Sequence, residues 1–403
     1  GPFVVDKNQK VIVNQYSWNK VANMLFIEQP AGVGFSFPAA ENTTDEMTAQ
    51  DTYSAIREIL SNYGLLDHEF YIFGESYGGH YVPNTVKAVL DGNAALPAGD
   101  KAINMKGFGV GNGYTDWEQD FESNVPYARF HGLCSPAQFE AANVSCGGKF
   151  APCFWAREGY DCSDECNKTV AAATANAFLL DMYDIYEDQC QTGGVVNQQA
   201  VLHAMRTGGG LGNTPISPVF DTCAEQYATE YLSSSEVHKA IGAKGVTQWS
   251  MCGLVNDGSG TAKKDPAEYF FNFTSTAPYY QQWAAPTADD LRILVYSGDA
   301  DFIVNFMGTL NWLGQLGFDT ENNGDFVPWR GSDGQVAGFV TKFVNPNFRF
   351  ATVKGAGHMV PKDRPRHALD LFTAFLSKTP IDQIKKQSDQ PLCAARLSEE
   401  IEI

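Results

Sequence analysis

A serine between glycines is the first residue of this chain whose setting indicates catalysis. Residues 74–78 read Gly-Glu-Ser-Tyr-Gly and match G-x-S-x-G, in which a sharp turn between a strand and a helix exposes the serine hydroxyl. The context fits, because an apolar run (69–73) precedes the motif and a helical pattern (81–90) follows it. We therefore predict Ser76 as a nucleophile rather than as an incidental serine in a glycine-rich turn.

A serine hydroxyl needs a base to take its proton. Of the seven histidines, His358 lies in a glycine-rich loop (355–361) just beyond a predicted strand. His80 is only four residues from Ser76, where we expect it to pack or to face solvent, and His367 falls in the terminal helix. His358 is accordingly the predicted base.

The acid that orients the base should follow an intervening strand. Asp299 and Asp301 both lie just after the apolar run 291–297, and spacing alone leaves the two open. The chain order serine, acid, histidine is that of α/β-hydrolases and differs from the chymotrypsin and subtilisin orders.

The elements that must position these residues alternate between strand and helix, which predicts an α/β-hydrolase fold with a mostly parallel sheet. The expected strands are 20–28, 69–73, 103–110, 291–297 and 347–353, and the expected helices are 45–63, 81–90 and 364–376.

The pattern breaks near residue 115, where cysteines become crowded and an alanine-rich helix (169–186) is expected. We read 117–261 as a disulfide-rich, largely helical cap inserted into the hydrolase core. Residues 1–116 and 262–403 then form the first and second parts of that core.

Composition limits the partners and the compartment. The formal net charge of −19 opposes binding to nucleic acid and to anionic membranes. Dense cysteines and four N-glycosylation sequons favour the secretory pathway, with a vacuolar, lysosomal or secreted protein. No histidine pair accompanies Cys162 and Cys166, so we expect no metal, and no cofactor is indicated. The sequons are at Asn42, Asn143, Asn167 and Asn272.

Taken together, the motifs resemble the serine carboxypeptidases, a family that includes fungal vacuolar (carboxypeptidase Y), plant and lysosomal (cathepsin A-like) enzymes. The resemblance implies that Asp301 is the acid and Asp299 structural, and that Glu75 grips the C-terminal carboxylate of a peptide or protein substrate. Two carboxyl groups can bind only by sharing a proton, so we expect activity to be favoured at acidic pH. The matching stretches are 17–19, 26–37, 73–83, 111–113, 297–301 and 355–361.

The family also carries an Asn-Gly-Gly-Pro-Gly-Cys-Ser-Ser segment that supplies one oxyanion amide, and this segment is not in the sequence. Tyr77 offers the other amide, its own backbone N–H. The nine cysteines are odd in number, and Cys252 resembles the family cysteine bonded to that segment. We therefore expect an N-terminal segment or chain linked through Cys252, and we leave a homodimer open.

These inferences predict a serine-type carboxypeptidase that works through an acyl-enzyme. An acyltransferase or lyase on the same scaffold is the first alternative. A catalytically silent binding or chaperone-like homologue is the second.

Overall fold

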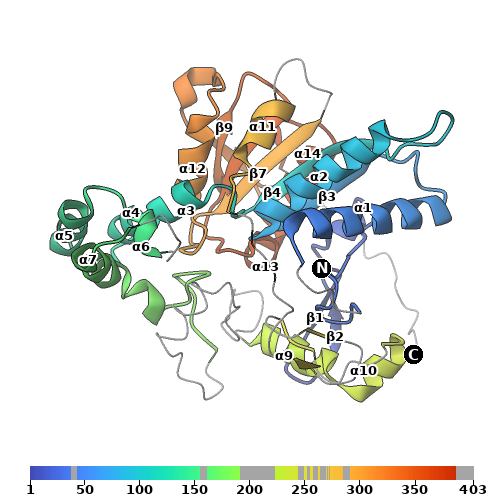
Figure 1. Ribbon diagram of the computed structural model, residues 1–403, viewed down its shortest axis with the longest axis horizontal. Helices are drawn as coiled ribbons and strands as arrows, with labels where there is room; N and C mark the ends of the chain where they lie inside the picture. Colours follow the sequence, from blue (N-terminus) through green and yellow to red (C-terminus); the bar gives the residue numbers. More distant parts are fainter. Residues whose placement is uncertain are drawn as a thin grey trace.

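A six-stranded sheet forms the centre of the protein in the computed structural model (Figure 1). The structure describes residues 1–37, 43–154, 161–190, 223–243, 249–251, 255–256, 262–263, 269, 271, 273–284 and 291–386. The first four strands are parallel and the last two antiparallel, so the predicted mostly parallel sheet is confirmed. The strand order is β3 (Phe70–Glu75), β4 (Met105–Gly111), β7 (Arg292–Gly298), β10 (Phe348–Val353), β9 (Val336–Lys342) and β8 (Val327–Arg330).

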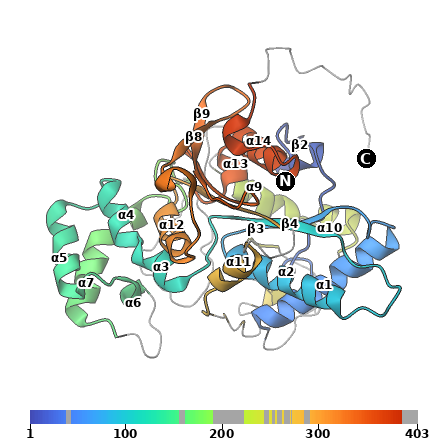
Figure 2. The same ribbon diagram turned by 90° about the horizontal axis from the view of Figure 1, so that it is seen from above.

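Alternate residues of β7 enter two separate cores, as the two-residue period of a strand requires. Ile293 and Val295 pack on the face covered by one group of helices, whereas Leu294 and Tyr296 pack on the opposite face. Figure 2 shows helices on both sides of the sheet. The first face carries α1 (Asp45–Asn62), α2 (Gly78–Ala94), α11 (Ala277–Trp283) and α12 (Phe306–Gln315), and the second carries α13 (Val360–Asp363) and α14 (Pro365–Leu376).

The other described elements flank the sheet and its covering helices. The strands are β1 (Phe3–Val5), β2 (Val11–Val13), β5 (Val255–Asn256) and β6 (Ala262–Lys263). The α-helices are α3 (Trp117–Glu122), α4 (Asn124–Phe130), α5 (Pro136–Cys146), α6 (Ala151–Phe154), α7 (Asp164–Thr174), α9 (Ala224–Leu232) and α10 (Ser235–Ala240). The short 3-10 turns are η1 (Trp18–Lys20), η2 (Ala177–Leu179), η3 (Glu321–Gly324) and η4 (Ile381–Gln383).

Strong periodic patterns predicted the core elements well, but the strand expected over residues 20–28 is wrong. Residues 21–28 pair with no strand, and Phe26 is 65% exposed. An apolar run becomes a strand only where a neighbouring strand satisfies its backbone. Glu28 instead closes a local turn, because its carboxylate accepts a hydrogen bond from the N–H of Phe35 at 2.7 Å.

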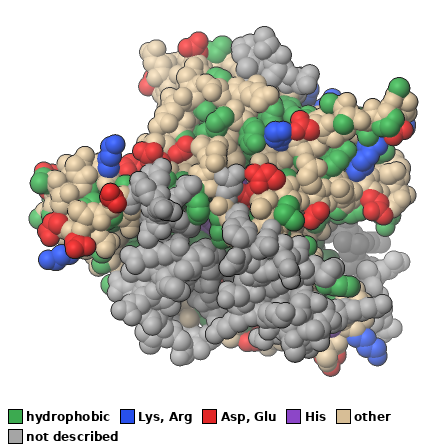
Figure 3. Space-filling view, in the orientation of Figure 1, with side chains coloured by type: hydrophobic (Ala, Val, Ile, Leu, Met, Phe, Trp, Pro, Cys, Tyr) green, Lys and Arg blue, Asp and Glu red, His purple; other side chains and the backbone are tan. Residues whose placement is uncertain are grey.

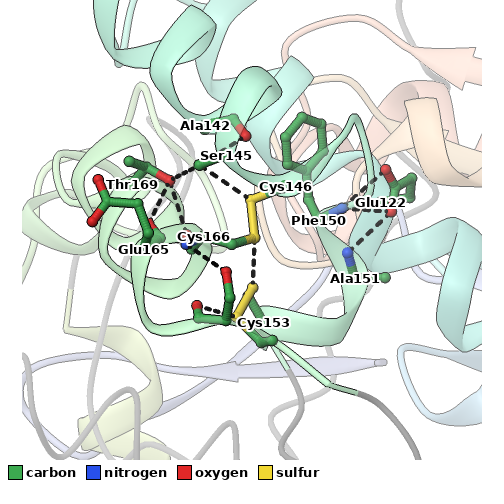
Figure 4. Close-up of a disulfide and its surroundings, with 12 residues drawn as sticks. Glu122, Ala142, Ser145, Cys146, Phe150, Ala151, Cys153, Glu165, Cys166 and Thr169 are labelled. Carbon is green, nitrogen blue, oxygen red and sulfur yellow. Dashed lines mark hydrogen bonds between the residues drawn. A yellow bond between two sulfur atoms is a disulfide. The ribbon is translucent and has the colours of Figure 1, made fainter.

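Disulfides tie the helical insertion together. Cys146–Cys166 joins α5 to α7 (Figure 4). A second disulfide, Cys153–Cys162, links residues nine positions apart in the sequence. In the same region the Glu122 carboxylate accepts hydrogen bonds from the N–H groups of Phe150 and Ala151 (Figure 4). The cap boundaries proposed from sequence stay a prediction. Among the described residues, Cys190 and Cys223 also form a disulfide, and Cys134 is a buried free thiol.

The single helix expected over residues 169–186 is also wrong. Helix α7 ends at Thr174, and only a short 3-10 turn follows. Beyond that turn Asp181 and Asp184 keep the chain non-helical, since each carboxylate accepts a hydrogen bond from the N–H two residues later, at 2.9 and 3.1 Å. Such turns compete with the helical hydrogen-bond ladder.

Acidic side chains are spread over the described part of the face in Figure 3, in keeping with the net charge of −19. Among the helices of the described residues, none is long and apolar enough to cross a membrane.

Helix α2 packs closely against the loop that follows β4, and Gly79 makes this approach feasible. A Cβ at Gly79 would lie 2.1 Å from the carbonyl oxygen of Tyr114. Gly79→Ala should therefore lower the free energy of unfolding by about 1–3 kcal/mol, measured by urea denaturation. Gly314→Ala is the matched control, because nothing lies within 4 Å of its added Cβ, and it should be neutral or stabilising by up to about 1 kcal/mol. Equal stabilities for the two variants would contradict this packing argument.

Candidate active site

Ser76 occupies a strained turn between β3 and α2. Its φ is 62°, a left-handed conformation that residues other than glycine rarely adopt. Backbone hydrogen bonds hold it there: the Ser76 N–H donates to the Gly111 carbonyl at 3.1 Å, and the Ser76 carbonyl accepts from Gly79 and Tyr114 at 2.9 and 2.8 Å. The G-x-S-x-G motif thus forms the sharp strand-to-helix turn that its sequence predicts.

The carboxylate of Asp301, just after β7, is 0% exposed. Its Oδ1 accepts a hydrogen bond from the N–H of Ile303 at 2.9 Å. Its Oδ2 accepts from the N–H of Val304 at 3.3 Å, from Asn112 Nδ2 at 2.9 Å and from His358 Nδ1 at 2.7 Å. These donors compensate for the water that the buried charge has lost.

His358 lies in the loop between β10 and α13, and that loop is fixed from two sides. The His358 N–H donates to the Tyr183 carbonyl at 2.6 Å, and the nearby Gly357 N–H donates to Asp363 Oδ2 at 2.8 Å. With Nδ1 bonded to Asp301, the other ring nitrogen, Nε2, is buried and has no hydrogen-bond partner. An imidazole held in this way presents Nε2 as a proton acceptor.

Asn112 is a residue to which sequence reasoning gave no role. It directly follows β4, is fully buried and has a φ of 38°. Its Nδ2 donates to Asp301 while its Oδ1 accepts from the Gly298 N–H at 2.9 Å. The sequence did contain a signal for Asn112, namely its position. It is a polar residue just after a predicted strand, as are Ser76 and Asp301, and polar residues at the carboxyl ends of parallel strands often form sites.

The other candidates lie elsewhere. Asp299 Oδ1 accepts a hydrogen bond from a backbone N–H in the loop that carries His358, at 2.6 Å. His80 is 1% exposed and stacks on Tyr77. His367 pairs with an aspartate on a neighbouring loop at 3.1 Å. Thus Asp301, and not Asp299, is the aspartate bonded to His358.

Glu75, the last residue of β3, has unusual electrostatics. Burial raises the pKa of Glu75 to about 7, against the opposing effect of the charge on His358. Burial also tends to lower the pKa of His358, but the negative charge of Asp301 and its hydrogen bond outweigh that effect and raise it. Each group therefore shifts the pKa of the other: the charge on His358 lowers that of Glu75, and the charge on Glu75 raises that of His358.

Four more acidic side chains lie around the His358 loop and share this behaviour. Burial is the main cause that raises the pKa of Asp181 to about 7, of Asp184 to about 6, of Glu187 to about 8 and of Asp363 to about 7. Oxygens of the last three lie within 4.8 Å of one another, an arrangement common without a bound ion. These four carboxyl groups therefore become protonated, and lose their negative charge, as the pH falls from about 8 to about 6.

Some predicted sites fall outside this description. Asn42, Asn272 and Cys252 lie outside the described residues. Of the other sequons, Asn167 is exposed on α7, and Asn143 is partly buried on α5.

The layered sheet and the serine turn define an α/β-hydrolase. The family model for serine carboxypeptidases matches residues 1–378, and the chain belongs to that family. It is 32% identical over 400 residues to Serine carboxypeptidase-like 33 and 33% identical over 395 residues to Serine carboxypeptidase 24, both of Arabidopsis thaliana. Each alignment covers 94% of this chain. It covers 76% of Serine carboxypeptidase-like 33 and 77% of Serine carboxypeptidase 24.

A solved structure has the same fold. It is that of Kex1(delta)p, a prohormone-processing carboxypeptidase from Saccharomyces cerevisiae. The TM-score is 0.67 at 18% sequence identity, and the match covers 94% of this chain and 78% of that chain.

Asn112 should matter for catalysis because it orients the acid of the candidate triad. Asn112→Ala removes a donor to the buried Asp301 carboxylate, so we expect kcat/KM for peptide hydrolysis to fall roughly 10- to 100-fold. Asn93→Ala is the control, since Asn93 also makes two hydrogen bonds, to the backbone of Ile103, but far from this site. Both variants should have lower melting temperatures, but only Asn112→Ala should lose kcat/KM. Equal losses of kcat/KM in the two variants would contradict a positioning role for Asn112.

Proposed function

We propose that this protein is a serine-type carboxypeptidase that releases C-terminal amino acids from peptides through an acyl-enzyme. The observation that carries the proposal is the His358 ring, whose Nδ1 bonds to Asp301 while its buried Nε2 has no hydrogen-bond partner. A base oriented in this way, at the same sheet edge as the Ser76 turn, suits proton transfer from a serine hydroxyl.

In the proposed reaction Ser76 Oγ attacks the carbonyl carbon of the last peptide bond, and its proton passes to His358 Nε2. The backbone N–H of Tyr77 stabilises the resulting oxyanion. The imidazolium then protonates the leaving amino group, the C–N bond breaks, and an acyl-Ser76 ester remains. Water, deprotonated by His358, hydrolyses this ester and regenerates the hydroxyl.

Glu75 is the proposed ligand of the substrate's C-terminal carboxylate. A protonated carboxyl group can donate a hydrogen bond to a carboxylate, whereas two ionised groups repel each other. The raised pKa of Glu75, about 7, keeps that proton in place at acidic pH. This feature supports a preference for acidic conditions.

Two alternatives use the same residues differently. An acyltransferase or lyase on this scaffold would keep the same triad, and Glu75 beside Ser76 favours the peptidase because it suits a free carboxylate. A silent binding or chaperone-like protein would have no reactive serine.

Several further predictions from the sequence belong to this proposal. The partners are peptide or protein C-termini, and we propose a route through the secretory pathway to a vacuole, a lysosome or the exterior. Glycans are proposed at the four sequons, and a disulfide partner for Cys252 remains an expectation.

A fluorophosphonate probe tests the nucleophile directly. We expect the wild type to be labelled stoichiometrically, with Ser76→Ala unlabelled and inactive on a blocked dipeptide that has a free C-terminus. Asp301→Asn should lower kcat by roughly 10⁴-fold, and Asp299→Asn, which changes a neighbouring, partly buried aspartate, should cost much less. A wild type that stays unlabelled would identify a silent homologue, and the reverse order of the two Asn variants would refute Asp301 as the acid.

Glu75→Gln should change the pH profile. In the wild type, carboxylate binding needs neutral Glu75 and is lost as the pH rises through about 7. Glutamine donates a hydrogen bond at every pH, so KM should stop rising on the alkaline side. The check is kcat and KM from pH 4 to 9, and an unchanged profile would remove Glu75 from carboxylate recognition.

A further inference from the structure

Asp45, the first residue of α1, is a buried carboxylate that the proposed reaction does not use. It is 1% exposed. The N-cap of this helix is the neighbouring Thr44, whose hydroxyl accepts a hydrogen bond from the N–H of Met47. A buried charge is costly unless polar groups are arranged around it, so the neighbours of Asp45 indicate what it holds in place.

Two phenol hydroxyls donate to this carboxylate. Tyr77 Oη donates to Oδ2 at 3.0 Å, and Tyr269 Oη donates to Oδ1 at 2.5 Å. Burial raises the pKa of Tyr269, so its hydroxyl stays protonated and remains a donor. His80 Nδ1 lies 3.8 Å from Oδ2, but burial lowers the pKa of His80 to about 4, so the ring is neutral near neutral pH.

Tyr77 is also the residue whose backbone N–H we propose as an oxyanion donor. Its ring stacks on His80 with centroids 4.9 Å apart and meets Tyr81 and Phe271 edge-on at 4.9 and 5.0 Å. Aromatic contacts leave a ring some freedom to slide, whereas the bond from its hydroxyl to Asp45 fixes the far end of the side chain. The Tyr77 side chain is thereby anchored at a point remote from its peptide.

We propose that Asp45 is a positioning residue for the oxyanion site, which it serves through the Tyr77 side chain. The N–H of the Ser76–Tyr77 peptide must point at the developing negative charge. Gly79 and Tyr114 hold the carbonyl of this peptide, and the anchored ring adds a restraint at its Tyr77 end. Tyr269, far along the chain, joins the same carboxylate and ties the segment after the insertion to the serine turn. This inference rests on the proposed function, since it concerns the same acyl-transfer step.

The kinetic signature follows from when the donor acts. An oxyanion donor stabilises the transition state and contributes little to the bound substrate, so its misorientation lowers kcat with little change in KM. A role limited to folding would instead lower the melting temperature and the fraction of active sites, and would leave kcat per active site unchanged.

The experiment uses Asp45→Ala, Asp45→Asn, Tyr77→Phe and the double variant Asp45→Ala/Tyr77→Phe. On a blocked dipeptide we expect each single variant to lower kcat per titrated active site. The loss should be roughly 10- to 100-fold for Asp45→Ala and Tyr77→Phe and smaller for Asp45→Asn, and KM should change less than about threefold. The double variant should be no slower than the slower single variant, because both changes break one linkage. Active sites are counted with the fluorophosphonate, and Asp45→Asn keeps the side-chain volume if Asp45→Ala folds poorly.

Glu46→Gln is the matched control, because it removes an exposed carboxylate from the same first turn of α1, and it should retain wild-type kcat. Three outcomes would overturn the positioning role while leaving the carboxypeptidase proposal intact. The losses could multiply in the double variant, the change could be confined to KM, or kcat could be unchanged in Asp45→Asn and Tyr77→Phe. A wild type with neither labelling nor hydrolysis would overturn both.

Discussion

The hydrogen bonds that converge on the Asp301 carboxylate hold the candidate site together. Their donors come from three parts of the chain: the residues just after Asp301 itself, Asn112 beyond β4, and His358 beyond β10. Each part leaves the same edge of the sheet, because β3, β4, β7 and β10 are parallel neighbours. The register of those strands therefore decides whether a buried negative charge meets its donors, and no local segment can supply this geometry alone.

Close packing at the serine turn is the second constraint. The left-handed conformation of Ser76 is costly by itself, and the backbone bonds to Gly111 and Tyr114 maintain it. Those bonds require α2 to approach the loop after β4 so closely that Gly79 has no room for a side chain. Strain at Ser76 is thus offset by packing and hydrogen bonding around it, as is common at functional sites.

Burial of acidic groups would make the proposed site sensitive to pH. Glu75 and the carboxyl groups near the His358 loop all have pKa values raised chiefly by removal from water. In a chain of net charge −19, each such group is easier to bury once protonated. The same physical cause that would let Glu75 bind a carboxylate would also reduce the negative field around His358 at acidic pH.

The sequence by itself determined the class of fold, because α1, β3, α2, β4, β7, β10 and α14 have clear periodic patterns, and the motif around Ser76 lies between two of them. It failed for residues 20–28, since apolar composition cannot tell whether a neighbouring strand is present, and for 169–186, where Asp181 and Asp184 form turns. The family resemblance favoured Asp301 over Asp299, but only the tertiary structure shows that Asp301 bonds to His358 and that Asn112 bonds to Asp301. Hydrogen bonds between residues so far apart in the chain depend on strand register and helix packing, which act across the fold and leave no local pattern in the sequence.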